Sequence, residues 1–555
     1  MAKDEGIPWW KKTTVYQIYP RSYFDSNGDG IGDLKGIISK LDYIKSLGVE
    51  TIWFSPFYDS PQEDFGYDIK NYRGIAPEYG TMEDCEKLIE EIHARGMKIV
   101  FDMVLNHTSD KHPWFVESRS SKDNPKRDWY IWRDGRKPKG KKPPNNWQSM
   151  TTGSGWHYDE TTEQYYWAEF LPFQPDLNFR NPEVKDEMLD TMRFWLEKGA
   201  DGFRLDIINA VYEDEEFRDN PHSWRLLPSE KSTAMLFVNP IHTLNHPDTL
   251  EFMKELRQVT DEFSNPERFI VGEVTAPVNT IKKYLGEKTD GLHTVFTFKT
   301  LDVKFKAKDV KKLIIEFDEH FPEPFIPTWV YGNHDRVRSI SLVSGDIPKG
   351  KLKAALQLTV RGVPYIYYGE EIGMEQHKIP IKKSKDAVTF KLKWIPNFVF
   401  ELLRGVIRGY INRDECRTPM QWSGEENVGF CPPSVEPWLP VTKSFPERNV
   451  KAEEDDLDSI LNCYKRFLKA RKETPALNAG EIEVMDSKEI PKDVLYYIRK
   501  LDGSEAHVFL NFNKKAVTFP SPVKGKELLV STTIKSNPLE GGNLTLLPWE
   551  GIVMQ

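Results

Sequence analysis

The sequence has few cysteines, no long apolar run and no excess of positive charge. Its four cysteines, Cys85, Cys416, Cys431 and Cys463, are too few and too scattered for a disulfide framework or a zinc site. A net charge of −9 offers no basic surface for nucleic acid, and no apolar run is long enough to cross a membrane. The N-terminus also lacks the apolar segment of a signal peptide. We therefore expect a cytoplasmic protein with no nucleic-acid partner and no membrane span.

The chain does have a long alternation of strand-like and helix-like segments. Several of the expected helices end at a glycine, such as Gly48 or Gly96. The expected strands are 15–20, 51–56, 98–107, 202–206, 269–273, 294–298, 327–335 and 363–371, and the expected helices include 34–47, 82–95, 184–198, 249–263, 351–361 and 457–471. This α/β pattern predicts a (β/α)8 TIM barrel. An open doubly wound sheet is the alternative, which the lack of a Gly-rich phosphate turn disfavours.

Two stretches interrupt this alternation and predict further domains. Residues 107–181 are rich in Trp, Tyr, Pro and Asn without helical periodicity, and a loop of that length needs structure of its own. In residues 481–555, alternating apolar runs separated by Gly, Pro, Asn and Asp predict an antiparallel β-sandwich. The expected organisation is barrel (domain A) over 1–106 and 182–480, inserted domain B over 107–181 after the third strand, and C-terminal domain C over 481–555.

The most informative motif is GFRLD at 202–206, in the fourth strand. Because side chains alternate along a strand, Arg204 and Asp206 lie on one face. A structural ion pair is the ordinary explanation for two such charges. However, other strands also end in polar residues, and active sites of barrels lie where the carboxyl ends of the strands meet. The further polar residues at these ends are Asp102, Asn106, His107, Glu273, Asn333, His334 and Asp335.

Several carboxylates on one rim, without a metal-spaced Cys/His set or a nucleotide loop, fit acid–base chemistry on a glycosidic bond. One carboxylate must stay ionised as the nucleophile, and Arg204 beside Asp206 favours that state by attraction. Another must keep a proton for the leaving oxygen, so apolar neighbours must raise its pKa. Glu273 ends the apolar run FIVG and fits this second role.

Four segments in order also resemble the signatures of a known family. DMVLNH (102–107), GFRLD (202–206), VGE (271–273) and GNHD (332–335) are similar to the ordered motifs of the α-amylase superfamily, glycoside hydrolase family 13. In addition, QPDLN (174–178) and RDECRTPMQW (413–422) resemble the oligo-1,6-glucosidase and α-glucosidase branch of that superfamily. The resemblance spans nearly the whole chain, including the inserted and C-terminal domains.

The resemblance implies a role for each matching residue. Asp206 would be the nucleophile that forms a covalent glucosyl intermediate, Glu273 the general acid/base, and Asp335 a third carboxylate that holds the sugar hydroxyls. The residues expected to line the glucose pocket are Tyr67, Asp68, His107, Arg204, His334 and Arg413. A retaining mechanism of this kind predicts that the carboxyl groups of Asp206 and Glu273 lie about 5–5.5 Å apart.

A loop after the first strand, DSNGDGIGD (25–33), has the pattern of a hard-cation site. Oxygen-bearing side chains alternate with glycines, as in an EF-hand loop, although the terminal bidentate Glu is missing. The proposed ligands are the side chains of Asp25, Asn27, Asp29 and Asp33 and the carbonyl of Ile31. We expect a structural Ca²⁺, with Mg²⁺ as the second candidate. A turn held by Asx side chains without a metal is the alternative.

The substrate expected from these features is a short oligosaccharide or disaccharide, from which a narrow pocket removes one glucose. Ile207 is apolar and β-branched and resembles the residue of relatives that prefer α-1,6 links, so isomaltose-like substrates are favoured, with maltose and sucrose as further candidates. Two other functions stay open: a transglucosylase or sugar isomerase, and a non-catalytic transporter-ancillary relative. We expect a monomer or homodimer. The Lys-rich segment 375–409 is interpreted as a lid, an oligomer contact or a membrane-surface helix.

Overall fold

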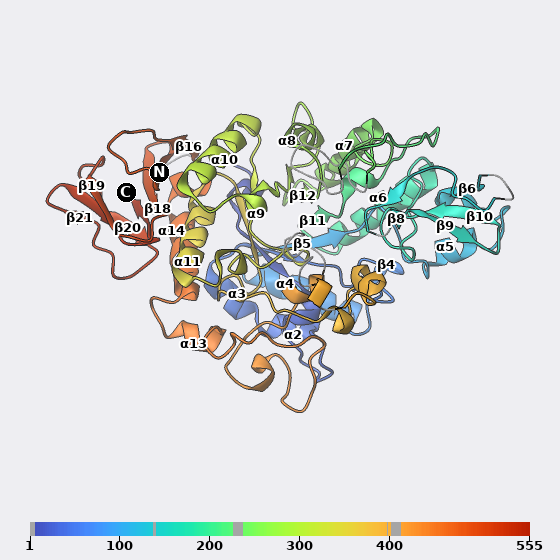
Figure 1. The fold of residues 1–555 in the computed structure, drawn as a ribbon, viewed down its shortest axis with the longest axis horizontal. Helices are drawn as coiled ribbons and strands as arrows, with labels where there is room; N and C mark the ends of the chain where they lie inside the picture. The colour runs from blue at the N-terminus through green and yellow to red at the C-terminus, as the bar shows by residue number, and fades with distance from the viewer. Residues whose placement is uncertain (1–5, 137–139, 152, 226–236, 397, 401–411) are drawn as a thin grey trace.

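Eight parallel strands form the centre of the molecule (Figure 1). The computed structural model describes residues 6–136, 140–151, 153–225, 237–396, 398–400 and 412–555. The strands are β1 (Val15–Ile18), β2 (Thr51–Phe54), β5 (Lys98–Met103), β11 (Gly202–Leu205), β12 (Phe269–Gly272), β13 (Thr294–Val295), β14 (Thr328–Val330) and β15 (Val363–Tyr367). They follow one another in chain order, and β1 pairs with both β2 and β15, so the sheet curls back on itself. The predicted TIM barrel is therefore confirmed.

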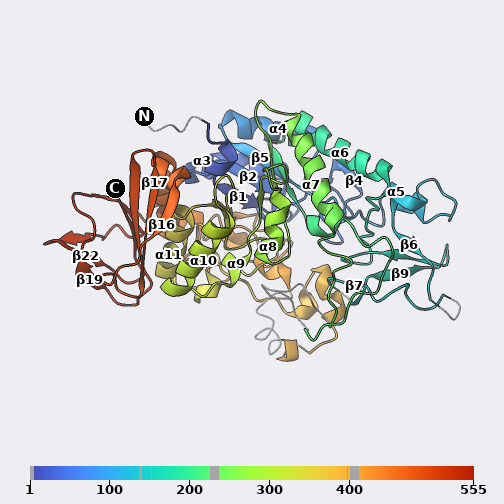
Figure 2. The same ribbon diagram turned by 90° about the horizontal axis from the view of Figure 1, so that it is seen from above.

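Helices cover the outside of this barrel (Figures 1 and 2). They are α2 (Leu34–Ser39), α3 (Leu41–Leu47), α4 (Met82–Ala94), α6 (Pro182–Glu197), α7 (Pro247–Asp261), α10 (Ala307–His320), α11 (Ile347–Thr359) and α14 (Ile460–Glu473).

The prediction of one helix over 34–47 was wrong. The Ser39 hydroxyl bonds back to the Gly36 carbonyl at 2.6 Å, and Lys40 leaves the helical conformation, which separates α2 from α3.

The strands are shorter than predicted at their carboxyl ends. The third strand, β5, ends at Met103 instead of residue 107, and β14 ends at Val330 instead of residue 335. Beyond these points the backbone leaves the strand conformation and turns into loops. The sequence pattern therefore located the strands correctly and overestimated their length.

The barrel interior changes from apolar to polar along each strand. Val100 and Val271 belong to the apolar cluster that fills the lower barrel, and they lie two residues before Asp102 and Glu273. Since side chains alternate with period 2, the valine and the following acid point to the same interior. A dry apolar plug thus forms the floor beneath a layer of charged groups.

The barrel wall between β13 and β14 is joined by threonine side chains. The Thr297 backbone N–H donates to Thr328 Oγ1 at 3.0 Å, and Thr328 Oγ1 donates to the Val295 carbonyl at 3.1 Å. No strand pairing between β13 and β14 is recorded in the part of the chain that the structure describes. We call this junction the threonine seam; it completes a nearly closed barrel.

Residues 107–181 form a small lobe at one end of the molecule, opposite the C-terminal sheets (Figures 1 and 2). The lobe holds an antiparallel sheet of β6 (Trp132–Arg133), β9 (Trp156–Asp159) and β10 (Gln164–Trp167) and a hairpin of β7 (Gln148–Ser149) and β8 (Gly153–Ser154). A short helix, α5 (Pro113–Ser118), was not predicted, because fewer than two turns leave no periodic pattern. A tryptophan cluster fills the lobe, and Phe217 from the loop after β11 stacks on Trp147.

Three carboxyl groups are buried together where this lobe returns to the barrel. Glu169 and Asp176 come from the lobe and Glu213 from the loop after β11, and each is at most 6% exposed. We call them the acid triplet. Burial, followed by the neighbouring acid charges, raises the pKa of Glu169 and of Asp176 well above their usual values, and burial raises the pKa of Glu213 to about 8. Arg180 donates to the carbonyl oxygen of Glu213 rather than to its carboxyl group.

The C-terminal residues form two antiparallel sheets that pack around a separate apolar core. One sheet contains β16 (Glu481–Val484), β17 (Val494–Leu501), β18 (Ser504–Asn511), β20 (Leu528–Ser531) and β23 (Gly551–Met554). The other contains β19 (Val517–Pro520), β21 (Leu539–Glu540) and β22 (Asn543–Leu546). The predicted antiparallel sandwich is confirmed.

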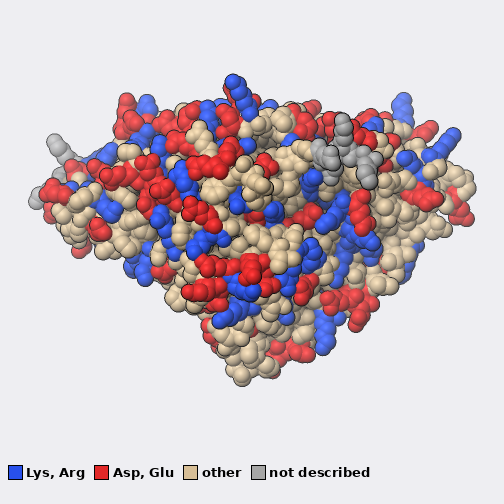
Figure 3. Space-filling view, turned by 180° about the vertical axis from the view of Figure 1, so that it is seen from behind, with Lys and Arg blue, Asp and Glu red and all other residues tan. Residues whose placement is uncertain are grey.

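The surface carries both signs of charge. On the face shown in Figure 3, Lys and Arg side chains and Asp and Glu side chains are interspersed, with other residues between them. Among the helices that the structure describes, none has the length and apolar character needed to cross a membrane.

Candidate active site

Arg204 is the centre of the polar layer at the top of the barrel. Its guanidinium donates to Asp102 at 2.8 Å and to Asp206 at 2.6 Å, and it also contacts Glu273. Arg204 lies opposite Asp102 in the register of the neighbouring strands β11 and β5. The pairing of these two strands therefore brings the Arg204–Asp102 ion pair together. The side chain is fully buried. The structure therefore brings together the predicted nucleophile and the predicted acid/base around one cation.

Burial and charge act in opposite directions on the two reacting carboxyl groups. Burial, together with the Asp206 charge, raises the pKa of Glu273 to about 7, although Arg204 pulls it down. This direction agrees with the role predicted for Glu273. Burial likewise raises the pKa of Asp206 to about 7, supported by the charges of Asp102 and Asp335. Arg204 lowers the pKa of Asp206 by attraction, as expected, but removal from water has the larger effect.

Asp335 has the opposite electrostatic environment. Burial alone would raise its pKa, but His334, Arg413 and Arg417 hold the pKa of Asp335 well below its usual value. Because burial lowers the pKa of His334 to about 3, that ring is neutral near pH 7 and the two guanidinium groups carry the effect. Arg417 donates to Asp335 at 2.7 Å, and the Arg413 guanidinium lies 3.6 Å from it. Asp335 is thus a permanent anion opposite the Arg204 cluster.

His334 and Tyr67 belong to one hydrogen-bond chain that reaches Asp102. Gln17 Nε2 donates to His334 Nδ1 at 2.8 Å, which assigns the ring proton to Nε2. His334 Nε2 then donates to the Tyr67 hydroxyl at 2.6 Å, and that hydroxyl donates to Asp102 at 3.1 Å. Gln17 was not predicted. It lies two residues after Val15 on β1, on the same inward face, and that alternation was the available signal.

His107 and Asp68 lie differently from the other predicted pocket residues. His107 Nε2 donates to the Tyr67 carbonyl at 3.1 Å, so it supports the backbone of the pocket. The Asp68 carboxylate accepts bonds from the Ser60 hydroxyl and from the backbone N–H groups of Glu63 and Asp64 at 2.9–3.0 Å. The structure therefore uses Asp68 to close its own loop and does not join it to the catalytic carboxyl groups.

Asp64 is the acid of that loop that the structure does bring to the site. Its carboxylate contacts the Arg413 guanidinium and accepts a bond from Gln174 of the lobe at 3.1 Å. Arg413 also binds Asp386 at 2.7 Å, so it links the loop after β2 to the segment 375–409. Residues 397 and 401–411 of this part of the chain lie outside the described residues. Sequence reasoning missed Asp64 because a contact 349 residues along the chain leaves no local pattern.

Ile207 has a strained backbone directly after Asp206. Its φ of 36° and ψ of 46° are left-handed, which is rare for a β-branched residue. The next N–H, of Ile208, donates to the Glu273 carbonyl at 3.1 Å. The turn therefore ties the backbones of the two reacting residues together. A conformation of this kind costs about 1–3 kcal/mol and persists only where the surrounding structure holds it.

The 25–33 loop closes through its own Asx side chains. Asp25 accepts the N–H groups of Asn27, Gly28 and Gly30 at 2.7–3.1 Å, and Asp29 accepts that of Ile31 at 2.8 Å. Within the described ranges, no group of three or more His, Cys, Asp or Glu side chains is placed to hold a metal ion. The loop geometry matches the alternative of an Asx turn, and Ca²⁺ or Mg²⁺ binding stays a prediction.

A chelator experiment tests the metal prediction. If Ca²⁺ binds the loop at 100 times its dissociation constant, it should stabilise the fold by about 2.7 kcal/mol, because binding favours the native state. The Tm should then rise when Ca²⁺ is added to chelator-treated protein. Asp29→Asn, at an exposed proposed ligand, should reduce that rise. An unchanged Tm with and without Ca²⁺ would contradict the prediction.

A pair of variants separates Asp64 from Asp68. Asp64→Asn should weaken the hold on Arg413 and lower kcat/KM on an α-glucoside about 10- to 150-fold, corresponding to the 1.5–3 kcal/mol typical of a charged hydrogen bond. Asp68→Asn should lower the Tm and leave kcat/KM nearly unchanged, because its bonds stay within the loop. Kinetics and thermal unfolding of both variants check this, and the reverse pattern would contradict it.

Comparison with known proteins agrees with this geometry. The family model described as "Alpha amylase, catalytic domain" matches residues 17–480. The chain is 41% identical to a probable alpha-glucosidase of Rhizobium meliloti (strain 1021), over 94% of this chain and 92% of that one. It is 39% identical to an oligo-1,6-glucosidase of Parageobacillus thermoglucosidasius, over 98% of both chains.

Two solved structures share the fold over nearly the whole chain. The trehalulose synthase MutB from Pseudomonas mesoacidophila MX-45 has a TM-score of 0.88 and 34% identity, with 99% of both chains covered. The alpha-glucosyl transfer enzyme XgtA has a TM-score of 0.87 and 36% identity, again with 99% of both chains covered. The family match spans most of the sequence and contains the Arg204 cluster, and the chain therefore belongs to the α-amylase family of glycoside hydrolases.

Proposed function

We propose that the protein is a retaining α-glucosidase that releases glucose from the non-reducing end of short α-glucosides. The observation that carries the proposal is the contact of Arg204 with both Asp206 and Glu273 in one buried layer. When two carboxyl groups share a cation, one can act as the nucleophile and the other as the general acid. The relatives named oligo-1,6-glucosidase and alpha-glucosidase support the same chemistry.

In the proposed reaction, Asp206 attacks the anomeric carbon while Glu273 gives its proton to the leaving oxygen. The bond from the sugar to that oxygen breaks, and a glucosyl–Asp206 ester forms. Glu273, now a carboxylate, takes a proton from water, whose oxygen then displaces Asp206. Asp335 stays ionised throughout because Arg413 and Arg417 neutralise it, so it can accept bonds from sugar hydroxyls.

Isomaltose-like substrates are the proposed preference. Ile207 is half-buried beside the buried Asp206, and an apolar side chain there would contact the leaving group. A hydrophobic contact of this size discriminates between substrates by only about 1–3 kcal/mol, so maltose and sucrose are proposed as further substrates. We also propose a cytoplasmic location and a monomeric or homodimeric state.

A transglucosylase or sugar isomerase is the second candidate. The likeness to the trehalulose synthase MutB and to the alpha-glucosyl transfer enzyme XgtA favours it specifically. Both candidates would use the same glucosyl–Asp206 intermediate. They differ in whether water or a second sugar accepts the glucosyl group.

A substrate panel separates the two candidates. The protein should release glucose from isomaltose and maltose, and NMR should detect α-glucose as the first anomer because two displacements retain configuration. Conversion of sucrose mainly into a rearranged disaccharide would favour the isomerase. Asp206→Asn serves as the blank in every assay, since it keeps the shape and removes the nucleophile.

The pH profile follows from the two raised pKa values. Asp206 must be ionised, so activity should be lost as pH falls through about 7, and Glu273 must be protonated, so activity should be lost as pH rises through about 7. A narrow bell-shaped dependence of kcat/KM on pH, centred near pH 7, is expected.

Asp206→Asn should lower kcat by at least about a thousandfold with unchanged circular dichroism. Near-normal turnover in that variant would reject the mechanism.

A further inference from the structure

Asp102 belongs to the layer around Arg204, but the proposed reaction gives it no step. The residue is 1% exposed, and its carboxylate accepts hydrogen bonds from three different groups. The Arg204 guanidinium donates to its two oxygens at 2.8 and 3.1 Å. The indole N–H of Trp53 donates to it at 3.2 Å, and the Tyr67 hydroxyl donates at 3.1 Å. Each of these donors stabilises the ionised form of Asp102.

The two reacting carboxyl groups have fewer donors. Asp206 accepts a bond from Arg204 at 2.6 Å, and Glu273 contacts the same guanidinium. Among the residues that the structure describes, no second donor to either carboxyl group is recorded. Because Arg204 contacts three acids, a proton on one of them reduces the uncompensated charge. The difference in donors makes Asp102 the least suitable of the three acids to hold that proton.

Trp53 contributes to this difference from beneath the layer. It is 1% exposed and belongs to the apolar cluster that also contains Val100. The guanidinium carbon of Arg204 lies 5.3 Å from the centre of its ring. The side chain of Trp53 is therefore enclosed by protein. Any effect of Trp53 on the reaction must act through Asp102 or Arg204 and not through contact with a sugar.

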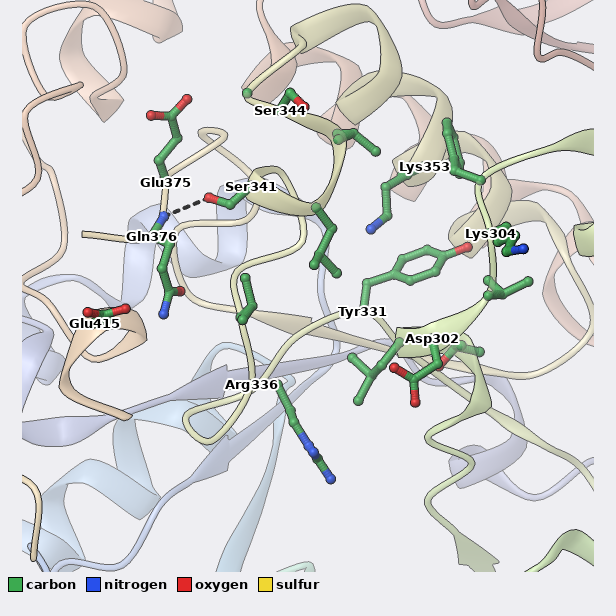
Figure 4. A pocket seen from close by; sticks show the side chains of 18 of the residues that line it. Asp302, Lys304, Tyr331, Arg336, Ser341, Ser344, Lys353, Glu375, Gln376 and Glu415 are labelled. Atoms are coloured by element: carbon green, nitrogen blue, oxygen red, sulfur yellow. Dashed lines mark hydrogen bonds between the residues drawn. The ribbon is translucent and has the colours of Figure 1, made fainter. Parts of the chain in front are cut away.

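Other charged and titratable groups also act on this layer. Those that face Asp102 are Arg204 and Asp206 from the β11 segment, Glu273 after β12, Tyr67 from the loop after β2 and Tyr58 from β3 (Tyr58–Asp59). Glu273 is faced in addition by Asp335 and Arg336. Arg336 extends from the loop after β14 and lines a cavity of about 710 Å³ (Figure 4). A cavity of this size admits water, which screens the charge of Arg336, whereas the donors to Asp102 act in a dry environment.

We propose that Trp53 is a positioning residue for the catalytic proton: its indole N–H, together with the Tyr67 hydroxyl, keeps Asp102 ionised, so that the proton of the layer stays on Glu273. This inference rests on the proposed glucosidase reaction, in which Glu273 gives a proton to the leaving oxygen. The order of the pKa values agrees with it. Burial raises the pKa of Asp102 to about 6, against the opposing effects of Arg204 and of the Tyr67 hydrogen bond. Burial raises the pKa of Asp206 and of Glu273 further, to about 7.

Trp53→Phe tests the proposal, because it removes the indole N–H and keeps an aromatic ring in the apolar cluster. With one donor fewer, Asp102 should bind a proton more readily, and its negative charge would then raise the pKa of Asp206 and of Glu273 less. Both limbs of the pH profile of kcat/KM should therefore move to lower pH, by about half a unit. On the alkaline side kcat should fall about threefold, the factor that half a pH unit represents. KM should change little, because Trp53 does not contact the substrate.

Trp329→Phe is the matched control. Trp329 is also 1% exposed on a barrel strand, but its indole N–H donates to the carbonyl oxygen of Arg361 at 2.9 Å, before β15. Trp329→Phe should lower the Tm, as Trp53→Phe does, and leave the pH profile unchanged.

A double-mutant cycle shows whether Trp53 acts through Asp102. In Asp102→Asn the side chain at this position can no longer take up a proton, so the addition of Trp53→Phe should move the pH profile no further. A purely structural effect of Trp53 would instead add to the effect of Asp102→Asn.

Tyr67→Phe removes the other neutral donor and is the second variant if Trp53→Phe does not fold. Its pH profile should move in the same direction. A shift to lower pH in these variants, without one in Trp329→Phe, supports the proposal. An unchanged profile, a shift to higher pH or an equal shift in Trp329→Phe would overturn it. A failure of the proposed function looks different, because the wild type itself would then not cleave isomaltose or maltose.

Discussion

One guanidinium group holds the catalytic layer together. Arg204 is fully buried and contacts Asp102, Asp206 and Glu273, so the four groups would carry a net charge of −2 if all were ionised. Two uncompensated charges in a dry site are expensive, and one bound proton halves that excess. The proton that acid catalysis requires therefore also reduces the net charge that the folded protein must bury.

The apolar floor beneath Arg204 makes this constraint strong. Val100 and Val271 exclude water from below, and Trp53 covers the guanidinium while its indole N–H donates to Asp102 at 3.2 Å. Asp335 lies on the other side, where Arg417 and Arg413 neutralise it. Three acids thus share the single guanidinium of Arg204, whereas Asp335 alone has two guanidinium groups beside it. This difference explains why Glu273 can keep a proton and Asp335 cannot.

The barrel and the position of the reacting carboxylates could be predicted because both rest on local patterns. Alternation along a strand placed Arg204 and Asp206 on one face, and the chain order of strands placed Glu273 next to them. What failed depended on distant contacts or on energy balance. Asp64 reaches the site through Arg413, far along the chain, whereas Asp68, four residues after Asp64, closes its own loop. The raised pKa of Asp206 required knowing the depth of burial, which the motif does not contain.

The acid triplet has a consequence for the way in which the lobe stays attached. Its three carboxyl groups keep their protons in the folded protein up to pH values where an unfolded chain has long released them, since free carboxyl groups titrate near pH 4. Each unit of pH above that range therefore lowers the free energy of unfolding until Glu213 itself ionises near pH 8. Like charges then accumulate between lobe and barrel. In alkali, repulsion among these charges would weaken the attachment of the lobe to the barrel.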